Sequence, residues 1–145
     1  MKLFVYGTLK RGYGNNTFLR DCKFLDEAIS LHARYSMSGN GIPFLSEGGS
    51  RHVKGELWEV DESSLERIDR LEGHPDHYCR KERVFVKKSD SERVVAWVYL
   101  VDDHYGRRSG DYGELLEWPP KKRRAEPDRL IRMALSSKFM KPYLV

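Results

Sequence analysis

Two short segments of this 145-residue chain carry residue types that can do chemistry together. Residues 2–6 (KLFVY) are typical of a β-strand, and residues 7–12 (GTLKRG) follow at once as a turn. A strand that stops at a glycine exposes a row of backbone N–H groups, which can bind an anion. Far along the chain, residues 71–75 (LEGHP) offer a single carboxylate, Glu72, in a loop context. A donor-rich turn and a lone acid/base are sufficient for a reaction that moves protons while an oxygen gathers negative charge.

The elements that must position these segments are mostly strands. Alternating apolar and polar residues predict a half-buried strand over residues 25–35, and residues 53–60 predict another. Residues 78–88 and 93–101 predict a hairpin with a short polar loop. Its second strand is apolar almost throughout, so we expect burial on both faces. The shorter segments are interpreted as a loop over residues 36–40, an edge strand over 42–45 and a turn over 48–50.

One longer helix is predicted with clear ends. Asp61 can cap its N-terminus, apolar residues recur every third position inside it, and Gly73 and Pro75 end it. A short helix is predicted over residues 15–19, with asparagine as its cap. Several short strands around one helix predict an α+β fold, a small curved-sheet or β-barrel domain with flanking helices.

The composition of the chain changes at Asp102, where a polar, glycine-rich stretch begins. We therefore expect one domain over residues 1–113 and a C-terminal extension over residues 114–145, packed on the same domain. The extension contains a basic run at residues 121–124 and a predicted short helix at residues 127–135, with proline in its first turn.

Composition argues against several classes of protein. The 26 basic and 22 acidic residues leave a net charge of only +4, which does not by itself predict nucleic-acid binding. No apolar run is long enough for a membrane span, and the N-terminus lacks the pattern of a signal peptide, so we expect a cytoplasmic protein. Cys22 and Cys79 form no metal-binding pair, and His74 and His77 are interpreted as a solvated surface pair rather than a zinc site. We expect no metal, and a small-molecule partner for a monomer or homodimer.

Three segments together resemble the gamma-glutamylcyclotransferase-like family. Residues 6–12 (YGTLKRG) match its opening YGSL or YGTL turn. Residues 53–61 (VKGELWEVD) are similar to its GxLWxVD strand-to-helix step, and residues 68–80 (IDRLEGHPDHYCR) to its LDxxEGxPxxYxR stretch. Their order and spacing match the small gamma-glutamylamine cyclotransferase branch best. The resemblance covers residues 2–101 and does not extend to the tail.

The resemblance implies a compact barrel with flanking helices and chemistry without a cofactor. In the implied reaction, the α-amino group of a gamma-glutamyl amide attacks its own γ-carbonyl, releasing an amine or amino acid and 5-oxoproline. By position, the implied acid/base is Glu72. The implied substrate-binding residues are those of the turn, largely through backbone groups, and a tyrosine after the EG motif: Tyr6, Gly7, Thr8, Leu9 and Tyr78.

These residue types suit such a reaction. The nucleophile is tethered to the electrophile, and well-oriented intramolecular reactions reach effective molarities on the order of 10⁵–10⁸ M. A carboxylate can first take a proton from the α-ammonium and then give one to the departing amine. An exposed glutamate titrates near ~4.3, so we expect partial burial to raise the pKa of Glu72. The N–H groups of the turn can hold the α-carboxylate or the oxygen that gathers charge.

Less specific roles stay open for several of these residues. Glu72 is alternatively a helix-end carboxylate that faces water, and Tyr6 a core aromatic whose hydroxyl needs a partner. Gly7 and Thr8 alternatively only form the turn, and Tyr78 alternatively only packs. The other carboxylates that compete with Glu72 are Glu56, Glu59, Glu66 and Glu82, of which Glu56 and Glu82 lie in predicted strands. Arg80 and Glu82 are interpreted as a surface pair, and Lys10 and Arg11 as solvated cations.

Two other functions compete with catalysis. The same fold could serve as a non-catalytic small-ligand binding or regulatory protein, with the tail as its docking element. The basic run at residues 121–124 allows a nucleic-acid-associated protein, which we rank last because no base-stacking motif accompanies it.

Overall fold

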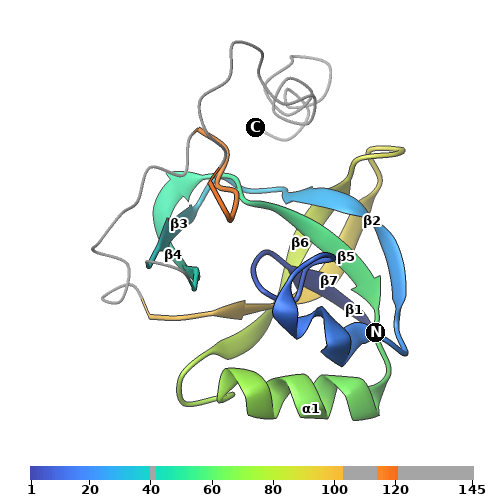
Figure 1. Ribbon diagram of the computed structural model, residues 1–145. Coiled ribbons are helices and arrows are strands. Elements are labelled where there is room, and N and C mark those ends of the chain that lie inside the picture. Colours follow the sequence, from blue (N-terminus) through green and yellow to red (C-terminus); the bar gives the residue numbers. More distant parts are fainter. Residues whose placement is uncertain (40–41, 103–113, 121–145) are drawn as a thin grey trace.

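The computed structural model, which describes residues 1–39, 42–102 and 114–120, contains a closed barrel of five strands (Figure 1). The barrel order is β1-β5-β2-β6-β7, and β1 closes it by pairing in parallel with β7 at Leu3 and Trp97. A separate two-stranded sheet pairs β3 with β4. The elements are β1 (Lys2–Val5), η1 (Gly14–Leu19), β2 (Lys23–Ser30), β3 (Tyr35–Ser38), β4 (Phe44–Arg51), β5 (Lys54–Glu59), α1 (Glu62–Glu72), β6 (Cys79–Lys87) and β7 (Arg93–Leu100). The predicted α+β barrel with flanking helices is confirmed.

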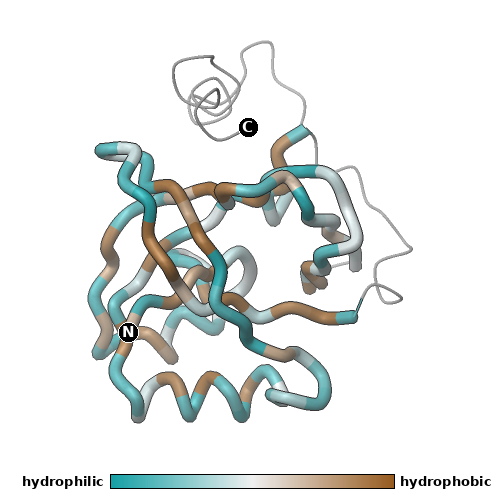
Figure 2. Tube along the Cα trace, turned by 180° about the vertical axis from the view of Figure 1, so that it is seen from behind, coloured by the Kyte–Doolittle hydropathy of each residue, from teal (hydrophilic) through white to brown (hydrophobic). Residues whose placement is uncertain are grey.

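The alternation of side chains along the strands builds two cores. Phe4 faces the barrel interior and stacks on Phe85 with ring centroids 3.9 Å apart. Its neighbours Leu3 and Val5 point to the outer face, where they join a second core with the buried side chains of α1. Figure 2 shows the matching alternation of hydrophobic and hydrophilic residues along α1. The second core attaches α1 to the barrel wall and so fixes the position of the helix relative to the barrel.

The predicted helix has the predicted ends. The Asp61 carboxylate accepts a hydrogen bond from the Ser64 backbone N–H at 2.6 Å, as an N-cap does. Gly73 follows the helix with φ 70° and ψ 33°, in the left-handed region that favours glycine at this position. Glu72 is therefore the last helical residue, immediately before the chain turns away.

The predicted strand over residues 25–35 is wrong in part, because the chain bends after β2 and starts β3 at Tyr35. The Ser30 hydroxyl donates to the His32 carbonyl at 2.9 Å and accepts from the Val53 N–H at 3.0 Å, which stabilises the bend. The predicted loop over residues 36–40 and the turn over residues 48–50 are also wrong, since β3 and β4 run through most of them. A Cβ at Gly49 would lie 2.1 Å from the Tyr35 carbonyl oxygen, so glycine here serves a close strand approach at a bulge.

Strand β7 is buried on both faces over only part of its length. Ala96, Val98 and Tyr99 are buried as expected, whereas Val95 is 56% exposed. The side chain of Val95 lies on the outer face of the barrel, and α1 covers that face only near the later residues of the strand.

Residues 114–120 contact the barrel edge. Leu116 is buried in the barrel core and exchanges backbone hydrogen bonds with His52 and Lys54, at 2.9 and 2.8 Å. The predicted basic run at residues 121–124 and helix at residues 127–135 lie outside the described residues, and the expected domain boundary at residue 113 stays a prediction. Within the described ranges, no helix has the length and hydropathy that crossing a membrane requires.

Candidate active site

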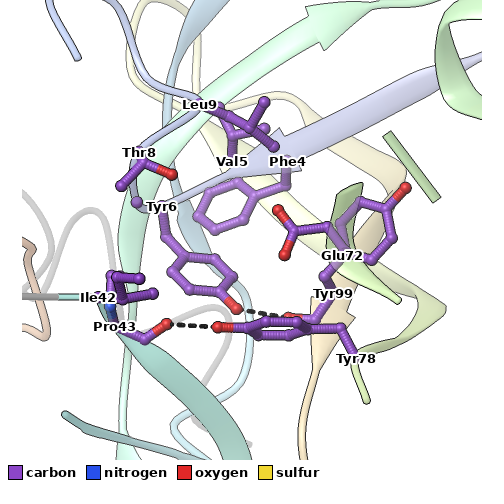
Figure 3. A pocket seen from close by; sticks show the side chains of 11 residues that line it. Phe4, Val5, Tyr6, Thr8, Leu9, Ile42, Pro43, Glu72, Tyr78 and Tyr99 are labelled. Carbon is purple, nitrogen blue, oxygen red and sulfur yellow. Dashed lines mark hydrogen bonds between the residues drawn. The ribbon is translucent and has the colours of Figure 1, made fainter. Parts of the chain in front are cut away.

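A pocket opens where the turn after β1, the residue pair before β4, the end of α1 and strand β7 meet (Figure 3). Its empty volume is about 370 Å³, including the open solvent at its mouth. The lining residues are Phe4, Val5, Tyr6, Gly7, Thr8, Leu9, Ile42, Pro43, Glu72, Tyr78 and Tyr99. All six residues predicted to form a site, Tyr6, Gly7, Thr8, Leu9, Glu72 and Tyr78, therefore line this pocket, although they come from segments more than 60 positions apart in the chain.

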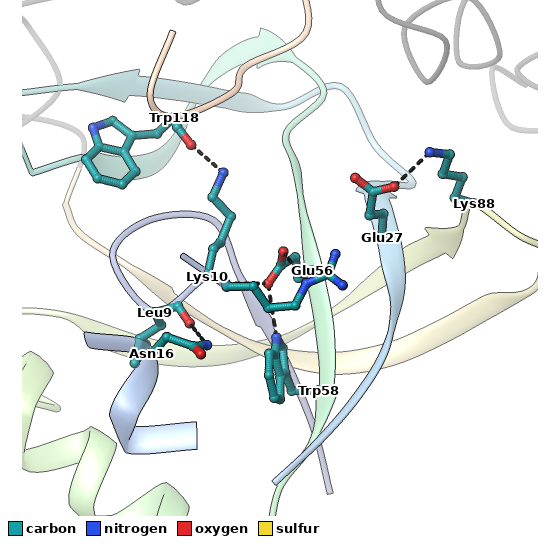
Figure 4. Close-up of polar contacts among 9 residues, drawn as sticks. Leu9, Lys10, Asn16, Glu27, Glu56, Trp58, Lys88 and Trp118 are labelled. Atoms are coloured by element: carbon teal, nitrogen blue, oxygen red, sulfur yellow. Dashed lines mark hydrogen bonds and ion pairs between the residues drawn. The ribbon is translucent and has the colours of Figure 1, made fainter. Parts of the chain in front are cut away.

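The turn after β1 is held by hydrogen bonds to its carbonyl groups. The Thr8 carbonyl accepts from the Asn15 N–H at 3.1 Å, and the Leu9 carbonyl from the Asn16 side chain at 2.8 Å (Figure 4). The side-chain amide of Asn15 also donates to the Thr8 hydroxyl, at 2.8 Å. Within the described part of the chain, the backbone N–H groups of residues 7–9 donate to no protein acceptor. The start of η1 thus fixes the turn through its acceptors and leaves its donors available to a ligand.

Gly7 has a steric role beyond that of permitting a turn. A Cβ at this position would lie 2.7 Å from Pro43 Cγ, closer than real Cβ contacts allow. The backbone of the turn therefore packs directly on Pro43, which forms the adjacent part of the pocket wall.

The Glu72 carboxylate points into the pocket from the end of α1 (Figure 3). Burial raises the pKa of Glu72 to about 7. None of the described lining residues is a lysine, arginine or histidine, so no cationic side chain among them compensates the half-buried negative charge. The expected rise in pKa is thus present, and it puts the group near the neutral range in which a carboxylate can both accept and donate a proton.

Three tyrosines form much of the remaining wall, and each hydroxyl donates to a fixed acceptor. Tyr6 donates to the Tyr99 carbonyl at 2.6 Å, Tyr78 to the Pro43 carbonyl at 2.9 Å, and Tyr99 to Asp69 Oδ1 at 2.7 Å. Burial, followed by the charges of Tyr78 and Glu72, raises the pKa of Tyr6 well above its ordinary value. The Tyr6 ring also belongs to the barrel core, so the two roles considered for it coexist.

The competing carboxylates in the strands lie elsewhere. Glu56 is buried against Arg11 and Trp58, and accepts from the Arg11 N–H at 3.0 Å and from Trp58 Nε1 at 3.2 Å (Figure 4). Arg11 Nε also pairs with Glu56 Oε2 at 3.1 Å. Arg11 is exposed, as expected of a solvated cation, but its pairing with Glu56 also attaches the far end of the turn to β5.

The predicted surface pair of Arg80 and Glu82 is also wrong. Arg80 Nε donates to Asp69 Oδ1 at 2.8 Å instead, since α1 brings a half-buried carboxylate over this end of β6. Glu82 is exposed. Lys10 is not a solvated cation either, because its ammonium donates to the Trp118 carbonyl.

Five lining residues were not predicted from the sequence: Phe4, Val5, Ile42, Pro43 and Tyr99. Tyr99 lies in an apolar run that is typical of a buried strand. Its hydroxyl group is the sequence feature that indicates another role. Pro43 and Ile42 lie in a connection whose position depends on how the β3–β4 sheet folds over the barrel.

Comparisons with known proteins identify relatives of this chain by sequence and by fold. A family model described as gamma-glutamyl cyclotransferase, AIG2-like matches residues 3–118. The candidate gamma-glutamylcyclotransferase MJ1514 of Methanocaldococcus jannaschii is 40% identical over 114 residues, which are 76% of this chain and 93% of that protein. Human gamma-glutamylaminecyclotransferase is 38% identical over 87 residues, which are 54% of this chain and 57% of the human protein. The crystal structure of a mouse AIG2-like protein superposes with a TM-score of 0.68 at 26% identity, covering 85% of this chain and 97% of the mouse chain.

Proposed function

The chain belongs to the gamma-glutamyl cyclotransferase, AIG2-like family, and from that premise we propose that it cyclises the glutamyl part of a gamma-glutamyl amide to 5-oxoproline and releases the amine. The observation that carries the proposal is the position of Glu72, whose half-buried carboxylate shares one pocket with the donor-rich turn of residues 7–9. The motif spacing favours a gamma-glutamylamine as the substrate.

In the proposed reaction, Glu72 acts first as a general base. Its carboxylate takes a proton from the substrate's α-ammonium, and the freed amine attacks the γ-carbonyl carbon to form a five-membered ring. The carbonyl oxygen gains negative charge as the C–N bond forms, and the N–H groups of residues 7–9 are the donors available to stabilise it. Among the described lining residues none has a cationic side chain, so these neutral donors are also the candidate binding group for the α-carboxylate.

Glu72 then acts as a general acid. It gives its proton to the leaving nitrogen as the original amide C–N bond breaks. The carboxylate, ionised again, takes the second proton of the ring nitrogen, and this proton passes to the released amine. The products are 5-oxoproline and a protonated amine, so the reaction consumes no water and releases no net proton. A pKa near 7 suits both steps, because proton transfer is most effective when the catalytic group titrates near the working pH.

A direct assay tests the proposal. The full chain is incubated with a gamma-glutamyl derivative of a primary alkylamine and, separately, with a gamma-glutamyl dipeptide, and 5-oxoproline is quantified by chromatography. We expect release from at least one substrate, with a larger kcat/KM for the amine derivative. Binding of both substrates without turnover would contradict catalysis and favour a ligand-binding role.

The pH dependence of kcat/KM should show the titration of Glu72. The base must be ionised in the free enzyme, so kcat/KM is expected to fall about tenfold per pH unit below the pKa of about 7. Measuring 5-oxoproline release between pH 4 and 8 locates the midpoint of this decline. A midpoint near 4.5, the ordinary value for glutamate, would mean that an exposed carboxylate serves as the base.

A further inference from the structure

We infer that Asp69 and Tyr99 hold the two halves of the candidate site at a fixed position relative to each other, and that both act as positioning residues. We call this hydrogen-bonded pair the brace. This role depends on the proposed function, because the two halves are the acid/base at the end of α1 and the donor-rich turn after β1. Tyr99 lies between them on β7.

Tyr99 makes one hydrogen bond to each half. Its hydroxyl donates to Asp69 Oδ1 at 2.7 Å, and Asp69 lies one helical turn before Glu72. Its backbone carbonyl accepts from the Tyr6 hydroxyl at 2.6 Å, and Tyr6 directly precedes the turn. A single strand residue thus connects the helix that carries the acid/base to the segment that carries the donors, and Figure 3 shows its bond to Tyr6.

Arg80 fixes the helix end of the brace. Arg80 and Tyr99 are directly opposite each other in the β6–β7 ladder, and Arg80 Nε donates to the same oxygen of Asp69 at 2.8 Å. The guanidinium lies over the Trp97 ring, 4.3 Å from its centroid. Burial alone would raise the pKa of Asp69, but the hydrogen bonds from Arg80 and Tyr99 lower it below its ordinary value. Both bonds are therefore made to a charged carboxylate, which makes them stronger than neutral ones.

Glu72 needs such support because its own carboxylate lacks a hydrogen-bonding partner among the described residues. Its orientation depends on the last turn of α1, and helix ends fray. The Asp69 carbonyl also accepts the His74 N–H at 2.9 Å, so Asp69 holds the last turn through both its side chain and its backbone. A misplacement of about 1 Å can cost roughly 10²-fold in rate, so loosening this turn should affect catalysis.

The test compares Tyr99→Phe and Asp69→Asn with a matched control, Glu47→Gln. Glu47 forms a similar half-buried carboxylate–arginine pair with Arg83 of β6, at 2.7 and 2.8 Å, away from the pocket. Each brace variant is expected to lower kcat by roughly 10- to 100-fold with little change in KM. The double variant should lose less than the two single losses combined, because Asp69→Asn already weakens the hydrogen bond that Tyr99→Phe removes. Glu47→Gln should lower Tm without this loss of kcat.

A second readout is the pKa of Glu72, measured by carbon-13 NMR of its carboxylate. Tyr99→Phe alters no charge at neutral pH, so a fall of this pKa from about 7 towards 4.5 would report increased access of water to the helix end. An unchanged kcat and an unchanged Glu72 pKa in Tyr99→Phe would overturn the brace, as would losses of kcat no larger than those of Glu47→Gln. If the wild-type protein releases no 5-oxoproline, the proposed function fails, and the Glu72 pKa alone decides the brace.

Discussion

In Glu72→Gln, 5-oxoproline release is expected to fall by roughly 10²–10⁴-fold, with the loss mainly in kcat, as for removal of a general acid/base. Glutamine has nearly the same shape but can neither take the proton of the α-ammonium nor supply one to the departing amine. The steady-state assay with the best gamma-glutamyl substrate measures the loss. Undiminished release would overturn the proposed role of Glu72.

The same variant separates a catalytic role from a structural one. The folded-state pKa of Glu72 is raised above its ordinary value, so between pH 4.5 and about 7 the folded protein binds more protons than the unfolded chain. The stabilising contribution of this group is thus present below pH 4.5 and is lost as pH rises through 7. At pH 8, Glu72→Gln should therefore have a Tm equal to or above that of wild type. Glu66→Gln, an exposed position of α1, should change neither activity nor Tm.

In Gly7→Ala, the second large loss is expected, on the order of 10²-fold in kcat/KM. The new Cβ would lie 2.7 Å from Pro43 Cγ, so the turn and Pro43 must separate, and we expect the turn to move. That movement displaces the backbone N–H groups of residues 7–9 from their position relative to Glu72. Steady-state kinetics and the affinity for 5-oxoproline, measured by calorimetry, should both report the change.

Gly14→Ala is the matched control for this prediction. A Cβ at Gly14 meets nothing within 4 Å, and the residue follows the same turn on the exposed side. Its kinetics should equal those of wild type. If Gly7→Ala were as active as Gly14→Ala, the contact of the turn with Pro43 would have no part in positioning the donors.

Much of the fold was predictable because the deciding interactions are local. Asp61 and Gly73 determine the ends of α1 through contacts within a few residues, and the hairpin of β6 and β7 follows from two patterned strands and a short polar connection. The β3–β4 pairing at Tyr35 and Gly49 was not predicted, because the glycine pair at residues 48–49 resembles a turn. In the structure, Gly49 instead allows two strand backbones to approach closely. That approach involves residues 14 positions apart and leaves no local pattern.

The candidate site divides in the same way. The residue types at Glu72 and in the turn of residues 7–9, and their likeness to a known family, were determined by the sequence alone. Only the tertiary structure decided that they share a pocket, that Pro43 and Tyr99 complete its wall, and that Asp69 pairs with Arg80. The physical reason is that burial and long-range hydrogen bonds depend on which surfaces the barrel and α1 bring together. The raised pKa of Glu72 is a property of that enclosure rather than of its neighbours in the chain.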